Sequence, residues 1–207
     1  MNKYVYTDLE LLPEDLQGWN GTSNLFNDLI LKIKPRIIVE VGTWKGLSAI
    51  NMAKVVRDNK LDCKIFCIDT WLGSIEFITT MKDTPERNLL YKNGYPQVYY
   101  QFLSNVIHNE CEDIIIPIPN TSLNGAKFLK FNKISPDLVY LDASHEGEDV
   151  YHDLTHYFTL LKSGGTIFGD DFSDNWPGLK NSVLKFAKEN QLKLDIFENN
   201  YWILNKL

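Results

Sequence analysis

Three acidic residues and a histidine lie close behind two apolar segments in the second half of the chain. Asp142 and His145 follow the first segment, and the pair Asp170 and Asp171 follows the second. If the two segments are neighbouring parallel strands, their ends bring the three carboxylates together, and each raises the pKa of the others. A divalent cation resolves that repulsion, and oxygen ligands favour Mg²⁺, Mn²⁺ or Ca²⁺. We therefore expect Asp142, Asp170 and Asp171 to bind a metal ion; the alternative is a solvated or helix-capping aspartate pair.

His145 follows the first of these acids by three residues. The unperturbed pKa of histidine, about 6.5, lies near working pH, so the imidazole can accept a proton. A metal that binds a substrate oxygen lowers the pKa of that oxygen and makes the proton easier to remove. We expect His145 to be a general base. The alternative is a loop histidine that is held by Glu146 or Glu148.

A turn with two glycines follows the first apolar run of the chain, which ends in Glu40 and Val41. Glycine lets the backbone turn tightly and approach a ligand closely. The next helix offers unpaired N–H groups to a ligand at its first turn. A carboxylate at the end of an apolar strand needs a partner, which a ligand amine can supply. The turn lacks the G-x-G-x-x-G and Walker patterns, so a plain strand-to-helix turn is the alternative. The expected ligand-binding residues are Glu40, Gly42, Thr43, Lys45, Gly46 and Ser48.

The second apolar run ends in Asp69 and Thr70, and Asp69 lies 29 positions after Glu40. An acid at this strand end can accept both hydroxyls of a ribose. Together with the glycine turn, it favours a cofactor that contains adenosine. A capping or loop acid is the alternative for Asp69.

The pattern Glu40-x-Gly42-x-x-x-Gly46 followed by Asp69 resembles the cofactor motif of class I S-adenosylmethionine (SAM)-dependent methyltransferases. The resemblance implies that the glycine turn lies against the methionine part of SAM and that Asp69 holds the ribose. It also implies that the segment after the third strand contacts the adenine, through Thr121 and Ser122. Helix capping is the alternative role for these two hydroxyls.

The acids and the histidine resemble the metal site of small-molecule O-methyltransferases, in particular the macrocin and mycinamicin sugar O-methyltransferases. Catechol O-methyltransferase has a related metal layout. The resemblance extends from about residue 26 to residue 188. It implies that Asp142, Asp170 and Asp171 bind Mg²⁺, that Asp142 also borders the SAM site, and that His145 is the base. Proteins described as cephalosporin hydroxylases are similar to this pattern too.

Five short apolar runs predict buried strands, and two further runs predict a closing hairpin around 198–200. Helical patterns lie between them, so the order of elements predicts parallel crossovers. The fold class is α/β: a doubly wound, mostly parallel seven-stranded sheet with helices on both faces, Rossmann-like as in the methyltransferases. The predicted strands are 36–41, 64–68, 113–117, 137–141, 166–168, 192–197 and 201–204, and the predicted helices are 24–34, 47–59, 147–162 and 179–190.

The chain of 207 residues has the length of one domain, and we expect a single domain over 1–207. The segment 73–105 is long for a connection and is expected to be an inserted helix or lid, a substrate segment close to the site. It lies in an aromatic-rich region whose side chains line a substrate pocket or, as the alternative, fill the core. We expect Trp19 and Trp44 to cover the glycine turn. The aromatic residues of the region are Trp71, Phe77, Tyr91, Tyr95, Tyr99, Tyr100 and Phe102.

The net charge of −6 disfavours a nucleic-acid partner, because nucleic-acid-binding surfaces are usually basic. No apolar run approaches the roughly 20 residues of a membrane helix, and residues 1–10 have no signal-peptide pattern. The 3 cysteines are expected to be reduced thiols of a cytoplasmic protein.

These observations favour a SAM- and Mg²⁺-dependent O-methyltransferase that acts on a hydroxyl of a small molecule of sugar or phenol type. Alternatives are a hydroxylase or a non-catalytic SAM-binding protein on the same fold. An NAD-linked dehydrogenase is disfavoured by the missing G-x-G-x-x-G pattern. The sequence leaves the oligomeric state open, although related enzymes often self-associate.

Overall fold

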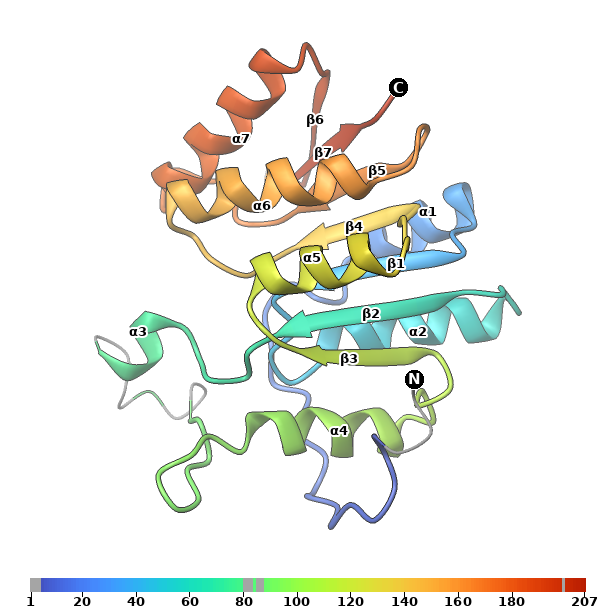
Figure 1. Cartoon of the computed structure of the whole chain (residues 1–207), viewed down its shortest axis with the longest axis vertical. Coiled ribbons are helices and arrows are strands. Elements are labelled where there is room, and N and C mark those ends of the chain that lie inside the picture. Colours follow the sequence, from blue (N-terminus) through green and yellow to red (C-terminus); the bar gives the residue numbers. More distant parts are fainter. Residues whose placement is uncertain (1–4, 80–83, 85–87, 199) are drawn as a thin grey trace.

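The central sheet of the protein is seen in a computed structural model that describes residues 5–79, 84, 88–198 and 200–207. In this part of the chain, seven strands form one sheet in the order β3-β2-β1-β4-β5-β7-β6 (Figure 1). β7 pairs antiparallel with β5 and with β6, and the other neighbours are parallel. The strands are β1 (Ile37–Val41), β2 (Lys64–Asp69), β3 (Ile115–Pro119), β4 (Leu138–Leu141), β5 (Thr166–Gly169), β6 (Leu194–Phe197) and β7 (Tyr201–Asn205).

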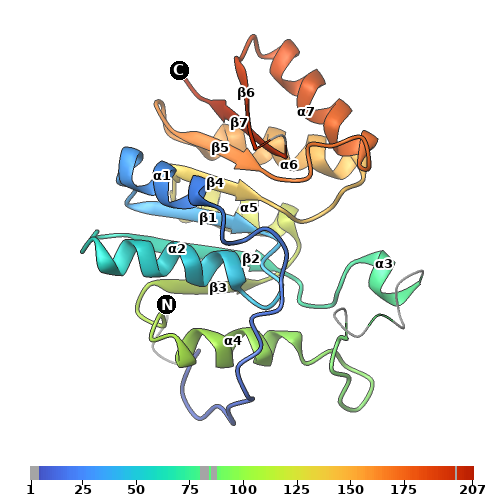
Figure 2. The ribbon, with the colours of Figure 1, turned by 180° about the vertical axis from the view of Figure 1, so that it is seen from behind.

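Helices cover both faces of this sheet, because its strands are apolar on both sides. On one face, Ile38 and Tyr140 pack with residues of α1 (Asn24–Ile33), α2 (Leu47–Asp58) and α4 (Val98–His108). On the other face, Val39 and Val139 pack with α5 (Ser122–Phe131), α6 (Gly147–Leu160) and α7 (Pro177–Glu189). Figure 2 shows α1 and α2 on the side opposite to α5 and α6. The predicted fold class is confirmed.

The predicted strands and helices coincide with observed elements apart from their ends. The third strand is shifted most: we predicted 113–117, but β3 is Ile115–Pro119. The amide groups of Ile114 and Ile115 both donate to the carbonyl of Cys111, so a turn occupies the first predicted positions. The predicted turn 198–200 contains Asn199, which lies outside the described residues.

The region predicted as an insert divides into different structures. A one-turn helix α3 (Ile75–Ile78) follows β2, and residues 80–83 and 85–87 lie outside the described residues. The last part of the predicted insert is the beginning of α4, where Val98, Phe102 and Leu103 are buried in the core. No bounds were predicted for α4 or α5, although an inserted helix was one reading of 73–105 and helix capping was the alternative role of Thr121 and Ser122 at the start of α5.

The N-terminal segment 12–22 has no regular structure and runs past α4 and the ends of β1 and α2 (Figure 2). It is anchored along its length: Leu12 N donates to Ser104 Oγ over 3.0 Å, and Asn51 Nδ2 donates to the carbonyl of Gly21 over 3.1 Å. We call this segment the N-terminal strap.

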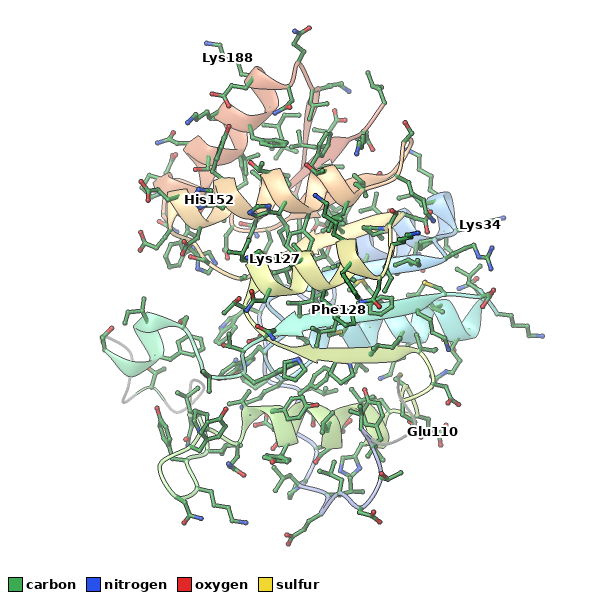
Figure 3. All side chains as sticks on the ribbon, viewed as in Figure 1. Lys34, Glu110, Lys127, Phe128, His152 and Lys188 are labelled. Atoms are coloured by element: carbon green, nitrogen blue, oxygen red, sulfur yellow. The ribbon has the colours of Figure 1, made fainter. Side chains whose placement is uncertain are left out.

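The exposed charged side chains include Lys34, Glu110, Lys127 and Lys188, which point outward (Figure 3). The cysteines Cys63, Cys67 and Cys111 are buried and free. Among the described residues, no helix has the length and apolar character that crossing a bilayer requires.

Candidate active site

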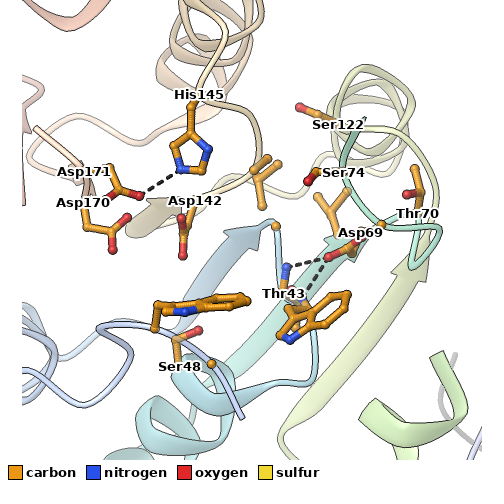
Figure 4. A pocket seen from close by; sticks show the side chains of 18 of the residues that line it. Thr43, Ser48, Asp69, Thr70, Ser74, Ser122, Asp142, His145, Asp170 and Asp171 are labelled. Carbon is orange, nitrogen blue, oxygen red and sulfur yellow. Dashed lines mark hydrogen bonds and ion pairs between the residues drawn. The ribbon is translucent and has the colours of Figure 1, made fainter. Parts of the chain in front are cut away.

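A cavity of about 410 Å³ opens where β1, β2, β4 and β5 end. Its two ends differ in chemistry: carboxylates and an imidazole gather at one end, and hydroxyl groups and one carboxylate gather at the other (Figure 4). We call these the acidic end and the hydroxyl end. The predicted site residues that line the cavity are Gly42, Thr43, Ser48, Asp69, Thr70, Ser122, Asp142, His145, Asp170 and Asp171.

Gly42 joins the two ends of the cavity. Its φ of +84° lies in the left-handed region that favours glycine. Its amide donates to the carbonyl of Ile68, and the amide of Asp142 donates to the carbonyl of Val41. The backbones at Gly42 and Asp142 are so close that only a residue without Cβ is accommodated.

Asp69 holds the turn after β1 in place. Its Oδ2 accepts hydrogen bonds from the amides of Thr43, over 2.8 Å, and Trp44, over 2.9 Å. Its Oδ1 accepts from the amide of Trp71 over 2.7 Å. Burial raises the pKa of Asp69, although these backbone hydrogen bonds act in the opposite direction. The carboxylate predicted to meet a ribose therefore also fixes the backbone beside it.

Glu40 lies behind the turn and outside the cavity lining. It is fully buried, and hydroxyls of Ser48 and Thr43 and the thiol of Cys67 donate to its carboxyl group. Burial raises its pKa to about 7, because desolvation outweighs these hydrogen bonds. The partners of Glu40 in the structure are thus side chains of the protein, whereas the sequence analysis expected a ligand amine.

Three further predicted ligand residues lie outside the cavity lining. Lys45 is buried, and its Nζ is 2.6 Å from Asp15 Oδ2 of the N-terminal strap. Gly46 has a φ of +91° and packs against Phe102. Thr121 is the N-cap of α5, where its hydroxyl accepts a hydrogen bond from the amide of Asn124.

Asp142, His145 and Asp171 form a compact group at the acidic end. One ligand atom of each lies within 4.8 Å of the others, as metal coordination requires. His145 Nε2 is 2.8 Å from Asp171 Oδ2, and Tyr140 Oη donates to Asp142 Oδ2 over 3.1 Å. The pKa of Asp142 is well above its ordinary value because of burial and the charges of the neighbouring aspartates.

Asp170 adjoins this group and is almost fully buried. It shares a hydrogen bond with Asp142, and its Oδ2 accepts from Asn20 Nδ2 over 3.2 Å. Burial and the charge of Asp171 raise its pKa to about 6. The structure thus brings all three predicted carboxylates together. The compact group suited to a metal includes His145, whereas the prediction placed Asp170 in that position.

An indole ring stacks on the imidazole of His145. The ring centroids of Trp176 and His145 are 4.1 Å apart, and the planes are inclined by 21°. Trp176 also lines the cavity. Trp176 was not among the predicted site residues, because nothing in the spacing of a loop tryptophan shows which side chain it covers.

Three aromatic rings lie together along the cavity. Trp19, Trp44 and Phe77 all line it, with centroid distances of 6.3 Å, 6.2 Å and 5.0 Å between them. By contrast, Trp71 and Phe102 are core residues. The pocket and core alternatives for the aromatic residues therefore both occur, at different positions.

The cavity lining contains polar residues that the sequence analysis did not select, namely Asn20, Ser74 and Asn120. Ser74 and Asn120 follow strand ends, which was the available signal. Asn20 gave no such signal, since the strap that carries it has no regular structure.

Solved O-methyltransferases share the fold. An O-methyltransferase from Bacillus cereus in complex with S-adenosylhomocysteine (SAH) is 16% identical, with 95% of this chain and 84% of that chain covered and a TM-score of 0.62. TomG from Streptomyces achromogenes, an O-methyltransferase involved in tomaymycin synthesis and solved with SAM, is 15% identical, with 89% and 79% covered and a TM-score of 0.59. The calicheamicin methyltransferase CalS11 is 18% identical, with 88% and 76% covered and a TM-score of 0.64. No protein of curated function matches the sequence.

A defined protein family matches the chain directly. The sequence pattern of a methyltransferase domain matches residues 39–172, which is more than half of the chain and includes the carboxyl ends of β1, β2, β4 and β5 at the cavity. The chain therefore belongs to this methyltransferase domain family.

Proposed function

We propose that the protein transfers the methyl group of SAM to a hydroxyl oxygen of a small molecule. The observation that carries this proposal is one cavity with two chemically distinct ends, joined at Gly42 and Asp142. The similarity to proteins named as O-methyltransferases supports the oxygen as the acceptor atom.

SAM occupies the hydroxyl end and the middle of the cavity in this proposal. Asp69, Thr70 and Ser122 face the adenosine part, and Thr43 and Ser48 lie beside the middle of the cavity. The amides held by Asp69 keep the turn in one conformation, so the cofactor meets a preorganised surface.

A divalent metal fits the acidic end. Asp142 and Asp171 present carboxylate oxygens within coordinating distance of each other, Asp170 adds a third carboxylate beside Asp142, and the imidazole of His145 adjoins this group. Burial and the neighbouring aspartates raise the pKa of Asp142 and of Asp170, and a bound cation would stabilise the charged form of both carboxyl groups. A bound Mg²⁺ supplies Lewis acidity that lowers the pKa of an acceptor hydroxyl.

The side chains of the protein align the reactants and take the proton. In the transfer, the acceptor oxygen forms a bond to the methyl carbon while the carbon–sulfur bond breaks and its electron pair returns to sulfur, leaving neutral SAH. The hydroxyl proton moves to the imidazole of His145, and Asp171 stabilises the imidazolium through its contact with Nε2. His145 and Asp171 thus act as a base and its orienting partner.

The acceptor is a small hydroxylated molecule of sugar or phenol type. The cavity of about 410 Å³ has the size of a small-molecule site and must hold the cofactor as well. The ring of Trp19, which is 43% exposed, offers an apolar face to a sugar or phenol ring.

Release of SAH from SAM in the presence of a panel of sugars and phenols tests the proposal. We expect release with at least one hydroxylated acceptor, dependence on Mg²⁺, and loss of release in the His145→Ala variant with SAM binding retained. The panel includes matched acceptors whose hydroxyl is replaced by an amine or a thiol. Turnover only with the amine or thiol analogues would contradict O-methylation.

The same variant separates two roles of His145. If the residue is the base, His145→Ala binds Mg²⁺ as tightly as the wild type and only turnover falls. A large loss of Mg²⁺ affinity in calorimetry would instead make His145 a metal ligand and would refute its assignment as the base.

A further inference from the structure

The imidazole of His145 is held on two sides by one stretch of chain. Asp171 contacts Nε2 over 2.8 Å, and the indole of Trp176 lies parallel to the ring plane at a centroid distance of 4.1 Å. Both residues belong to the connection between β5 and α7. The carboxylate limits movement of the ring within its plane, and the indole limits tilting out of the plane.

The backbone of the same region adjoins the backbone beside His145. A Cβ atom on Gly178 would lie 3.0 Å from the amide nitrogen of Gly147 and 3.3 Å from the carbonyl oxygen of His145. Ser182 Oγ donates to the carbonyl of Gly147 over 2.7 Å. The first turns of α6 and α7 are therefore packed closely, and the position of Trp176 relative to His145 is determined by backbone contacts.

Trp176 itself has a restricted backbone. It is the N-cap of α7, and Pro177 follows at the first helical position, where its fixed φ suits the helix. The amide of Trp176 donates to Ser173 O over 3.2 Å, and its carbonyl accepts from the amide of Lys180 over 3.0 Å. The indole thus projects from a backbone that is fixed on both sides.

We propose that Trp176 is a positioning residue, which keeps the imidazole of His145 in the orientation that proton transfer requires. The inference rests on the proposed function, in which His145 is the base. The terminal torsion of a histidine has a broad energy profile, so the ring needs neighbours to define its plane. A misplacement of a reacting group by about 1 Å can lower the rate about 100-fold, so a residue that fixes the orientation of the imidazole affects turnover. Trp176 lies beyond the residues 39–172 that match the methyltransferase family.

The stacking is tested without any reaction. An indole parallel to an imidazole shifts the ring protons of the imidazole upfield in the NMR spectrum. We expect one of the 4 histidines to show this shift, and His145→Ala identifies it. The shift disappears in Trp176→Ala and is partly retained in Trp176→Phe. An unshifted His145 signal in the wild type would overturn the proposal.

The positioning role is tested by the kinetics of the same variants. We expect kcat of Trp176→Ala to fall about 10- to 100-fold while KM for the acceptor and the dissociation constant of SAM stay unchanged. Trp176→Phe restores most of kcat, because a phenyl ring can stack on the imidazole. The control is Leu184→Ala on the same helix, where a side chain that is 45% exposed is removed far from the imidazole.

Two results would overturn the proposal. A rise of KM with unchanged kcat in Trp176→Ala would mean that the indole contacts the acceptor directly. Equal losses of kcat in Trp176→Ala and Trp176→Phe would show that turnover does not depend on an aromatic ring stacked on the imidazole. His145→Ala distinguishes failure of the positioning role from failure of the proposed function. Unchanged turnover in His145→Ala refutes the assignment of His145 as the base. Turnover that is lost in His145→Ala but retained in Trp176→Ala refutes only the positioning role of Trp176.

Discussion

A Cβ atom on Gly42 would lie 2.0 Å from the carbonyl oxygen of Asp142. The glycine turn after β1 and the acid after β4 are therefore in direct backbone contact. In the proposed function, Gly42 faces the cofactor and Asp142 faces the metal, so this contact would set the distance between methyl donor and acceptor.

Gly42→Ala should disrupt both parts of the site. The added methyl group meets the Asp142 backbone, and alanine also disfavours a φ of +84°. We expect a loss of about 3 kcal/mol or more in the free energy of unfolding, together with loss of SAM binding. Urea denaturation and calorimetry measure the two effects.

Gly164→Ala is the matched control for this substitution. Gly164 has a similar φ of +78°, but no atom lies within 4 Å of its added Cβ. Gly164→Ala should lower the free energy of unfolding only by the backbone strain, about 1 kcal/mol, and leave SAM binding intact. Equal costs in the two variants would contradict the importance of the contact with Asp142.

Glu40 should make stability depend on pH. Its pKa is about 7 in the folded protein and 4.5 in its ordinary state, so between these values the folded state binds more protons than the unfolded state. Stability therefore falls as the pH rises through this interval, by about 3 kcal/mol. Glu40→Gln should lack this pH dependence. As the pH increases from 4.5 to 7, the free energy of unfolding of the variant should therefore rise relative to that of the wild type. Parallel pH profiles of the wild type and Glu40→Gln in urea denaturation would disprove this role of Glu40.

Asp69→Asn should weaken SAM binding while retaining the fold. The carboxylate accepts three backbone hydrogen bonds, and an amide presents only one oxygen and adds a donor that faces other donors. Because a hydrogen bond to a charged group contributes about 1.5–3 kcal/mol, we expect the dissociation constant of SAM to rise about 10-fold or more. Calorimetry measures this change. Asp62→Asn, at an exposed carboxylate, is the control and should leave the constant unchanged.

Asp142→Asn should have opposite effects with and without Mg²⁺. Without metal, burial and then the neighbouring aspartates disfavour the charged form of Asp142, so replacing it by a neutral amide should raise the melting temperature. With metal, the wild type gains stability by mass action and the variant gains less. Thermal unfolding in Mg²⁺ and in EDTA measures both effects. A wild type that melts at the same temperature in the two buffers would argue against a metal at this end.

Trp19→Ala should change recognition of the acceptor more than stability. Trp19 lies on the N-terminal strap, lines the cavity and is 43% exposed. We expect the KM for the acceptor to rise with little change in melting temperature. Leu123→Ala removes a side chain of the same exposure, 43%, outside the cavity lining and should leave the KM unaffected.

The periodicity of the chain was sufficient to predict the sheet and four of its main helices, because buried parallel strands must be apolar on both faces. The rule that ligands lie at strand ends was sufficient to select four acids that line the cavity: Asp69 ends β2, Asp142 follows β4, and Asp170 and Asp171 follow β5. These inferences succeed because they depend on residues that are close together in the sequence.

Tertiary structure alone decided which predicted residues face the cavity and what completes it. Glu40 and Lys45 have the residue types of ligands, but the fold buries them against Ser48 and Asp15. Trp176 reaches the site through the packing of α6 on α7, and Asn20 reaches Asp170 across 150 positions of sequence. Contacts of this kind depend on the path of the whole chain, because side chains from distant segments meet only after the sheet and its helices have packed.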